Sequence, residues 1–179
     1  PRFATTRFLA DQGITVAAGH CNPDLDQLKG AIDSGLHMCT HLGNGCPMEL
    51  HRHDNIIQRA LSLSDQLWLC FIPDGVHVPF LTLTNYLKAA NLNRVIMVSD
   101  AISAASLGPG LYSLGDWDIK IGDDLVARSP DESHFIGSTV TWPRILKNLE
   151  GPLGFSENEI EQTTILNPRA ALAASANDV

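Results

Sequence analysis

The sequence has 179 residues and a formal net charge of −8, with 44% hydrophobic and 18% charged residues. This length and composition fit one ordinary globular domain with a substantial hydrophobic core. The acidic balance argues against non-specific nucleic-acid binding, which needs a basic face. No apolar run approaches the roughly 18 residues of a membrane helix, and residues 1–11 lack the pattern of a secretory signal. We therefore expect neither nucleic acid nor membrane as a partner.

The four cysteines do not predict a disulfide scaffold in a chain of this length. Cys39 and Cys70 lie within apolar runs, so we expect buried free thiols at both positions. Free thiols fit a reducing compartment, and the expected location is the cytoplasm.

The first hundred residues alternate between strand and helix patterns. Four apolar runs of strand length predict strands at 14–19, 36–41, 67–72 and 94–99. Helical patterns lie between them, and Asn22 as the cap with Pro23 at the first helical position predicts the start of the first helix. Strands buried on both faces read as continuous apolar runs, and helices then connect them in parallel. The pattern predicts four consecutive βα units in a parallel sheet or barrel wall.

The pattern changes after Asp100. Alternating residues at about 111–128, with turn signals at 115–116 and 122–123, predict a β-hairpin insertion. A helix is expected over 141–149, and Ser156 with Glu159 forms a capping box for another. Asn167-Pro168 is expected to interrupt the last helical segment.

Four strand ends present residues suited to catalysis. They are His20, His41, the pair Asp74 and His77, and Asp100. The carboxyl ends of parallel strands meet at one edge of a sheet, where ligands and catalytic groups collect. Two imidazoles with an open coordination position suit a catalytic zinc ion, and a nearby carboxylate can transfer protons. The strand ends therefore indicate a metal-dependent hydrolase.

Four short motifs in this order resemble one enzyme family. They are Thr-His-Leu-Gly-Asn-Gly at 40–45, Asp-Gly-Val-His at 74–77, Val-Ser-Asp-Ala at 98–101 and Ile-Gly-Ser at 136–138. Together they are similar to the N-acetylglucosamine-6-phosphate deacetylases of the amidohydrolase superfamily. The resemblance implies an α/β fold, a partial (β/α)8 TIM barrel with a small β-hairpin excursion. It also implies that residues 1–179 form a single domain, the C-terminal portion of the barrel, without the N-terminal barrel strands and the small β-sandwich domain.

The resemblance implies a role for each matching residue. His20 and His41 match metal ligands, and Asp100 matches the catalytic acid and base. Arg52 matches a phosphate contact, which suits a planar and permanently charged guanidinium. The substrate-binding residues implied in this way are Asn44, Gly45, Arg52, Asp74, Gly75, Val76, His77, Phe135, Ile136 and Gly137.

The implied reaction is hydrolysis of the acetamide of N-acetylglucosamine 6-phosphate to glucosamine 6-phosphate and acetate, in amino-sugar catabolism. The implied cofactor is a divalent metal, with zinc preferred, and the partner is a small phosphorylated amino sugar. The family's tendency to dimerise makes a homodimer an expectation. A half-barrel exposes sheet edges that normally pair, so we do not expect an active monomer of this chain alone.

Two alternative functions remain open from the sequence. One is an amidohydrolase of a different amide or cyclic amide, because Gly43 and Gly45 replace an aromatic residue and an alanine common in the family. The other is a non-catalytic half-barrel that acts as a binding module.

Several side chains near the predicted site have two interpretations. His51 and His53 have the spacing of a metal-binding pair, but their polar loop favours solvated or substrate-facing side chains. Cys21 and Cys46 are either soft metal ligands or, as we favour, packing thiols. The tryptophans are expected in the core or an interface, at Trp68, Trp117 and Trp142.

Overall fold

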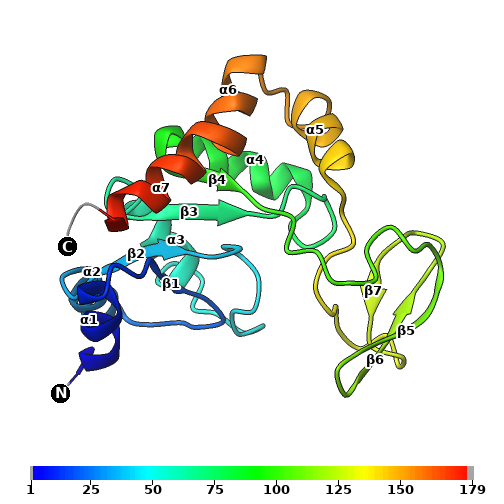
Figure 1. The fold of residues 1–179 in the computed structure, drawn as a ribbon, viewed down its shortest axis with the longest axis horizontal. Helices are drawn as coiled ribbons and strands as arrows, with labels where there is room; N and C mark the ends of the chain where they lie inside the picture. Colours follow the sequence, from blue (N-terminus) through cyan, green and yellow to red (C-terminus); the bar gives the residue numbers. More distant parts are fainter. Residues whose placement is uncertain (1, 177–179) are drawn as a thin grey trace.

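Four short strands form a parallel sheet in the computed structural model, which describes residues 2–176 (Figure 1). The strands pair in chain order: β1 Val16–Ala18, β2 Leu36–Cys39, β3 Trp68–Phe71 and β4 Val95–Met97. The connecting helices are α2 Leu25–Ile32, α3 Ile56–Ser62, α4 Phe80–Ala89 and the 3-10 helix η1 Leu92–Arg94. All three strand pairs are parallel, so the predicted βα alternation is confirmed.

Both faces of the sheet are buried. Leu69 and Phe71 of β3 are fully buried in the main core, which also contains Leu83 of α4. The alternate residues Trp68 and Cys70 are buried on the opposite face in a smaller cluster with Ala171. Burial on both faces explains why these strands read as continuous apolar runs and not as alternating ones.

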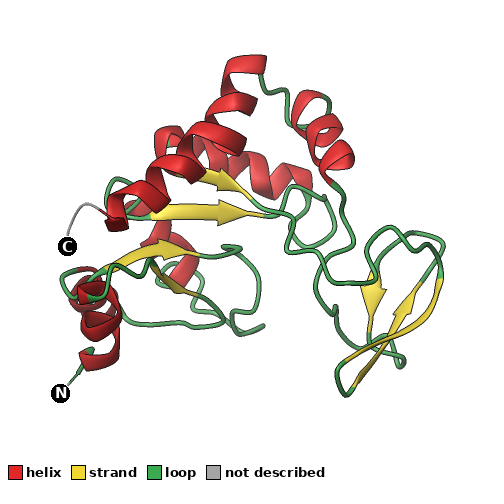
Figure 2. Ribbon diagram, in the orientation of Figure 1, coloured by secondary structure: helices red, strands yellow, loops and turns green. Residues whose placement is uncertain are grey.

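A second, antiparallel sheet follows β4 and lies apart from the parallel sheet (Figure 2). It consists of β5 Gly110–Leu114, β6 Trp117–Ile121 and β7 Ala127–Arg128, one strand more than the expected hairpin. Isoleucines of β6 pack with Ala127 and Ile136 in a separate small cluster. A parallel bridge between Ala101 and Ser138 ties the return segment to the end of the main sheet.

The C-terminal helices are α5 Trp142–Glu150, α6 Glu157–Glu161, the π-helix η2 Gln162–Leu166 and α7 Asn167–Ala176. The predicted capping box between Ser156 and Glu159 is confirmed at the start of α6. Asn167 is buried and donates to the carbonyl oxygens of Leu92 and Val95, which anchors α7 to the beginning of β4. No helix in the described part of the chain is long and apolar enough to cross a membrane.

Two helix starts differ from the sequence analysis, and two of the three tryptophans lie outside the core. Helix α1, Ala4–Asp11, was not expected. Trp117 is 61% exposed and Trp142 is 45% exposed, so neither is a core residue of this chain. The N-cap of α2 is Asp24, in a capping box with Gln27, and the helix begins two residues later than predicted. Asn22 is used elsewhere, because its side-chain oxygen accepts the backbone N–H of Ile56.

Candidate active site

His20 and His41 face each other at the ends of two adjacent strands. Their Nε2 atoms lie 3.1 Å apart, and the rings form an edge-on pair with centroids 4.8 Å apart. The parallel pairing of β1 with β2 continues past the strands, where the N–H of Thr40 donates to the carbonyl oxygen of Ala18. The sequence prediction that both imidazoles meet at one sheet edge is therefore reproduced by the geometry.

The pair fits two ligands of one divalent ion. Zinc–nitrogen bonds of about 2.0–2.1 Å at a tetrahedral angle place two nitrogens about 3.3 Å apart, close to the observed separation. The Nδ1 atom of buried His41 has no hydrogen-bond partner among the described residues. No group of three His, Cys, Asp or Glu side chains suited to a metal occurs in the described part of the chain. The spacing of the two Nε2 atoms therefore suits two metal ligands, and it equally suits a hydrogen bond between the imidazoles.

The backbone is strained at all three residues assigned to the metal and to proton transfer. His20, His41 and Asp100 have φ values of 52°, 32° and 48°. Such left-handed conformations cost about 1–3 kcal/mol for a non-glycine residue and cluster at active sites. Seven non-glycine residues in the described chain have positive φ, and three of them are these strand-end residues. This concentration is independent of the motif resemblance.

Asp100 follows β4 with an exposed side chain. Its carbonyl oxygen accepts the N–H of Ser138 at 3.0 Å, and the N–H of Ile102 donates to the Ser138 carbonyl oxygen at 2.9 Å. Gly137 has φ 61°, and a Cβ there would lie 2.5 Å from a methyl carbon of Ile102. The end of β4 and the segment around Gly137 are therefore held against each other by the backbone.

Asp74 and His77 form a hydrogen-bonded pair after β3. The Nδ1 atom of His77 lies 2.5 Å from one carboxylate oxygen of Asp74, and the other oxygen accepts the N–H groups of Val76 and His77. Burial raises the pKa of Asp74, but the hydrogen bond and charge of His77 and the two backbone donors outweigh it and lower the pKa overall. Asp74 is thus an ionised carboxylate that fixes the imidazole orientation.

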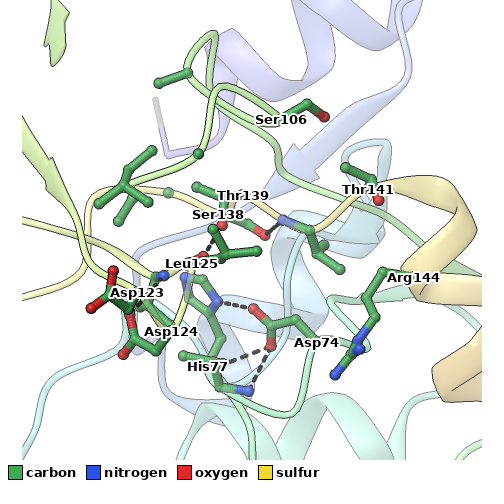
Figure 3. Close-up of a pocket in the computed structure, with 18 residues that line it drawn as sticks. Asp74, His77, Ser106, Asp123, Asp124, Leu125, Ser138, Thr139, Thr141 and Arg144 are labelled. Atoms are coloured by element: carbon green, nitrogen blue, oxygen red, sulfur yellow. Dashed lines mark hydrogen bonds and ion pairs between the residues drawn. The ribbon is translucent and has the colours of Figure 1, made fainter. Parts of the chain in front are cut away.

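The two predicted substrate segments meet in space. The ring of His77 lies 5.3 Å from the ring of Phe135, measured between centroids. A cavity of about 400 Å³ is lined by Asp74, Val76 and His77 on one side and by residues around Gly137 on the other (Figure 3). Further polar lining residues were not predicted to be in the site: Ser106, Asp123, Asp124, Ser138, Thr139, Thr141 and Arg144. Residues 122–123 are predicted only as a turn, and the sequence has no signal that folds this turn over the cavity.

Among the described residues, Arg144 is the only arginine or lysine that lines this cavity. Figure 3 shows its side chain beside Asp74. Within the described chain, Arg144 makes no side-chain hydrogen bond or ion pair, and the same holds for exposed Arg52. Arg52 does not line this cavity. The predicted phosphate contact and the cavity are therefore separate features within one copy of this chain.

The remaining candidates lie around the histidine pair. Asn44 lines a small space with His20, Cys21 and Cys46, and its side-chain nitrogen has no partner among the described residues. Burial, followed by the neighbouring charge of Cys46, raises the pKa of Cys21, which favours the thiol over a metal-binding thiolate. This supports the interpretation of packing thiols.

His51 is held in a turn and is not free to pair with His53 on a metal. Its Nδ1 atom accepts the N–H of Asp54 at 2.9 Å and that of His53 at 3.4 Å. A neutral imidazole that accepts at Nδ1 has its hydrogen on Nε2, which leaves no free lone pair. The geometry favours a structural role for His51 over metal binding.

Gly45 packs directly on the imidazole of His20. Its φ is 62°, and a Cβ added there would lie 2.5 Å from Nδ1 of His20. We expect Gly45→Ala to lower the free energy of unfolding by about 1–2 kcal/mol through backbone strain and to displace the ring. Gly115→Ala is the matched control, because Gly115 has φ 59° with nothing within 4 Å. Urea unfolding should show similar losses for both variants, whereas zinc affinity should fall only in Gly45→Ala. A zinc affinity of Gly45→Ala equal to that of the wild type would contradict the proposed effect of Gly45 on the His20 imidazole.

No protein-family model matches the chain. Curated relatives include the N-acetylglucosamine-6-phosphate deacetylase of Vibrio furnissii, 29% identical over 143 residues, with 80% of this chain and 35% of the relative covered. The N-acetylgalactosamine-6-phosphate deacetylase of Escherichia coli O157:H7 is 25% identical and covers 93% of this chain. The chain spans less than half the length of these relatives, 35% and 43% respectively.

Solved structures show the same similarity. N-acetylglucosamine-6-phosphate deacetylase from Thermotoga maritima superposes with a TM-score of 0.85 at 29% identity, over 95% of this chain and 46% of that one. The Mycobacterium smegmatis N-acetyl-D-glucosamine-6-phosphate deacetylase in complex with N-acetyl-D-glucosamine-6-phosphate gives 0.84 at 26% identity, over 96% and 45%. Over nearly all of its length the chain is therefore similar to these deacetylases in sequence and fold. The predicted α/β fold with part of a (β/α)8 barrel is confirmed.

Proposed function

We propose that the protein to which this chain belongs hydrolyses the acetamide of N-acetylglucosamine 6-phosphate, releasing glucosamine 6-phosphate and acetate. The observation that supports this most directly is the pair of Nε2 atoms 3.1 Å apart at adjacent strand ends. His20 and His41 would hold a divalent metal, for which we propose zinc. When bound, such an ion supplies Lewis-acid polarisation of the acetamide carbonyl and of the attacking water.

Asp100 is the proposed proton carrier. Its carboxylate takes the proton from the attacking water and then gives it to the departing amine, so that one group serves as base and then as acid. The group stands at the end of β4 with its side chain exposed, where it is accessible to a substrate. Asp100 has a left-handed backbone conformation, and the next residue, Ala101, pairs with Ser138. This pairing holds the backbone that carries the Asp100 carboxylate in a fixed position.

The sugar is proposed to bind between two segments, with Asp74 to His77 on one side and Phe135 to Gly137 on the other. Asp74 holds the imidazole of His77, leaving Nε2 free to donate or accept a hydrogen bond. Asn44 and Gly45 adjoin the histidine pair and would contact the acyl end of the substrate. We propose Arg52 as the phosphate contact, a cytoplasmic location, and a homodimer.

A first test compares acetate release from three sugars by the product of the complete gene. We expect strong preference for N-acetylglucosamine 6-phosphate over unphosphorylated N-acetylglucosamine. N-acetylgalactosamine 6-phosphate is the third substrate, because a curated relative is a deacetylase of that sugar. Equal turnover with and without phosphate would refute a phosphate pocket, and no turnover of any of the three would favour an amidohydrolase of another amide.

The phosphate contact is tested by Arg52→Gln. We expect KM for the phosphorylated sugar to rise about tenfold to a hundredfold, because a charge-assisted contact is lost, with little change for the unphosphorylated sugar. Arg144→Gln is the comparison variant, since Arg144 is the arginine of the cavity. An effect confined to Arg144→Gln would contradict the role of Arg52 and move the phosphate into the cavity.

A further inference from the structure

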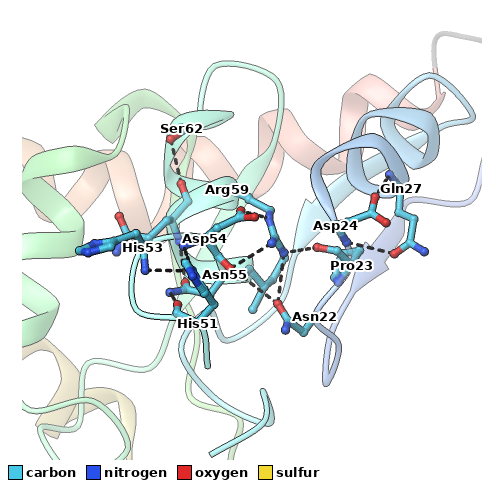
Figure 4. Close-up of polar contacts among 12 residues, drawn as sticks. Asn22, Pro23, Asp24, Gln27, His51, His53, Asp54, Asn55, Arg59 and Ser62 are labelled. Carbon is cyan, nitrogen blue, oxygen red and sulfur yellow. Dashed lines mark hydrogen bonds and ion pairs between the residues drawn. The ribbon is translucent and has the colours of Figure 1, made fainter. Parts of the chain in front are cut away.

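Arg59 of α3 bridges the two loops that follow β1 and β2. Its side chain is only 11% exposed. On one side it contacts the loop that begins at His20, and on the other the loop that contains Arg52 (Figure 4). An arginine on a helix surface is ordinarily solvated, so this degree of burial requires an explanation.

The guanidinium uses most of its donors in this bridge. One terminal nitrogen donates to the carbonyl oxygen of Pro23 at 2.5 Å and to the side-chain oxygen of Asn22 at 3.3 Å. Nε donates to the carboxylate of Asp54 at 2.7 Å, and the second terminal nitrogen donates to the Asp54 carbonyl oxygen at 3.0 Å. A planar fork that meets four oxygens on two loops fixes their relative position, which a flexible lysine does not.

Each loop is also ordered internally. The N–H of Ile56, the first residue of α3, donates to the side-chain oxygen of Asn22 at 3.0 Å, a further bond from α3 to the His20 loop. The side-chain nitrogen of Asn55 donates to the carbonyl oxygen of His51 at 2.8 Å, closing the turn that contains Arg52. Movement of the Arg52 loop and the start of α3 away from the His20 loop would therefore break the bonds that Arg59 and Ile56 make to Asn22 and Pro23.

We propose that Arg59 is a positioning residue that holds the Arg52 loop against the His20 loop. Its catalytic consequence rests on the proposed function: the bridge sets the distance between the substrate's phosphate contact and the metal ligands. Asn22 is the second member of the bridge, because it accepts from both Arg59 and Ile56. This role also explains why Asn22 does not cap α2.

The test uses Arg59→Leu, Arg59→Lys and Asn22→Ala in the full-length protein. We expect Arg59→Leu to accelerate amide hydrogen exchange at Ile56 and to raise KM for N-acetylglucosamine 6-phosphate about tenfold to a hundredfold. Arg59→Lys should show nearly the same exchange rate and KM as Arg59→Leu, because an ammonium group lacks the planar set of donors of a guanidinium. Arg59→Leu and Asn22→Ala should be non-additive in the double variant, since they remove one shared bridge.

Arg94→Leu is the control for general loss of an arginine. Arg94 lies over the ring of Trp68 at 5.0 Å, directly before β4 and at the opposite end of the strands from the site. Arg94→Leu should lower the free energy of unfolding without changing amide exchange at Ile56 or KM.

Unchanged amide exchange at Ile56 and unchanged KM in Arg59→Leu would overturn the proposal. If the wild type does not deacetylate this sugar, the proposed function fails, while exchange at Ile56 still decides whether Arg59 is the bridge.

Discussion

Asp100→Asn is expected to reduce deacetylation about 10²- to 10⁴-fold, the range of a lost general acid and base. Asparagine has the size of aspartate but cannot accept and return a proton at neutral pH. It also tolerates left-handed backbone better than most residues, so the φ of 48° at this position remains accessible. The Asp100→Asn variant should therefore fold like the wild type and lose only deacetylation activity.

The zinc content of Asp100→Asn distinguishes loss of proton transfer from loss of the metal site. Asp100 is assigned proton transfer more than metal ligation, so we expect zinc content, measured after dialysis, to match that of the wild type. Asp116→Asn, in the exposed turn between β5 and β6, is the control for removal of one negative charge. Wild-type turnover in Asp100→Asn would exclude the mechanism, and loss of zinc would reassign Asp100 to the ligand set.

The main sheet was predictable because burial leaves a strong local signal. Strand β3 is buried at every position and therefore appears as an uninterrupted apolar run. Once four such runs are connected by helices, parallel pairing places the residues after them at one edge. The meeting of His20 with His41 followed from that topology, although the 3.1 Å separation and the left-handed backbone did not.

The parts that the sequence did not predict depend on contacts between distant segments. Asn22 and Asp24 are both good helix caps, so local preference could not choose between them. The choice is made by Ile56 and Arg59, which use Asn22 from more than thirty residues away. Arg144 likewise reads as an ordinary helix residue until the small sheet and α5 enclose a cavity. Tertiary structure, and not local pattern, determines these roles.

His41→Asn is expected to abolish tight zinc binding. Loss of a residue that merely supports a ligand costs about 10- to 100-fold in metal affinity, so loss of the ligand itself should cost more. Asparagine again suits the left-handed backbone, here with φ 32°, but its amide is a poor substitute for imidazole on zinc. His20→Asn should behave in the same way, because the two Nε2 atoms face one position.

Thermal unfolding with and without zinc isolates this effect from stability. Ligand at a hundred times its dissociation constant stabilises the native state by about 2.7 kcal/mol, so zinc should raise Tm of the wild type and not of His41→Asn. His37→Asn, in the same strand β2, is the control and should keep the zinc-dependent rise. An equal rise in His41→Asn would show that the ion binds elsewhere. The 3.1 Å separation of the two Nε2 atoms would then be that of a hydrogen bond between the imidazoles of His20 and His41.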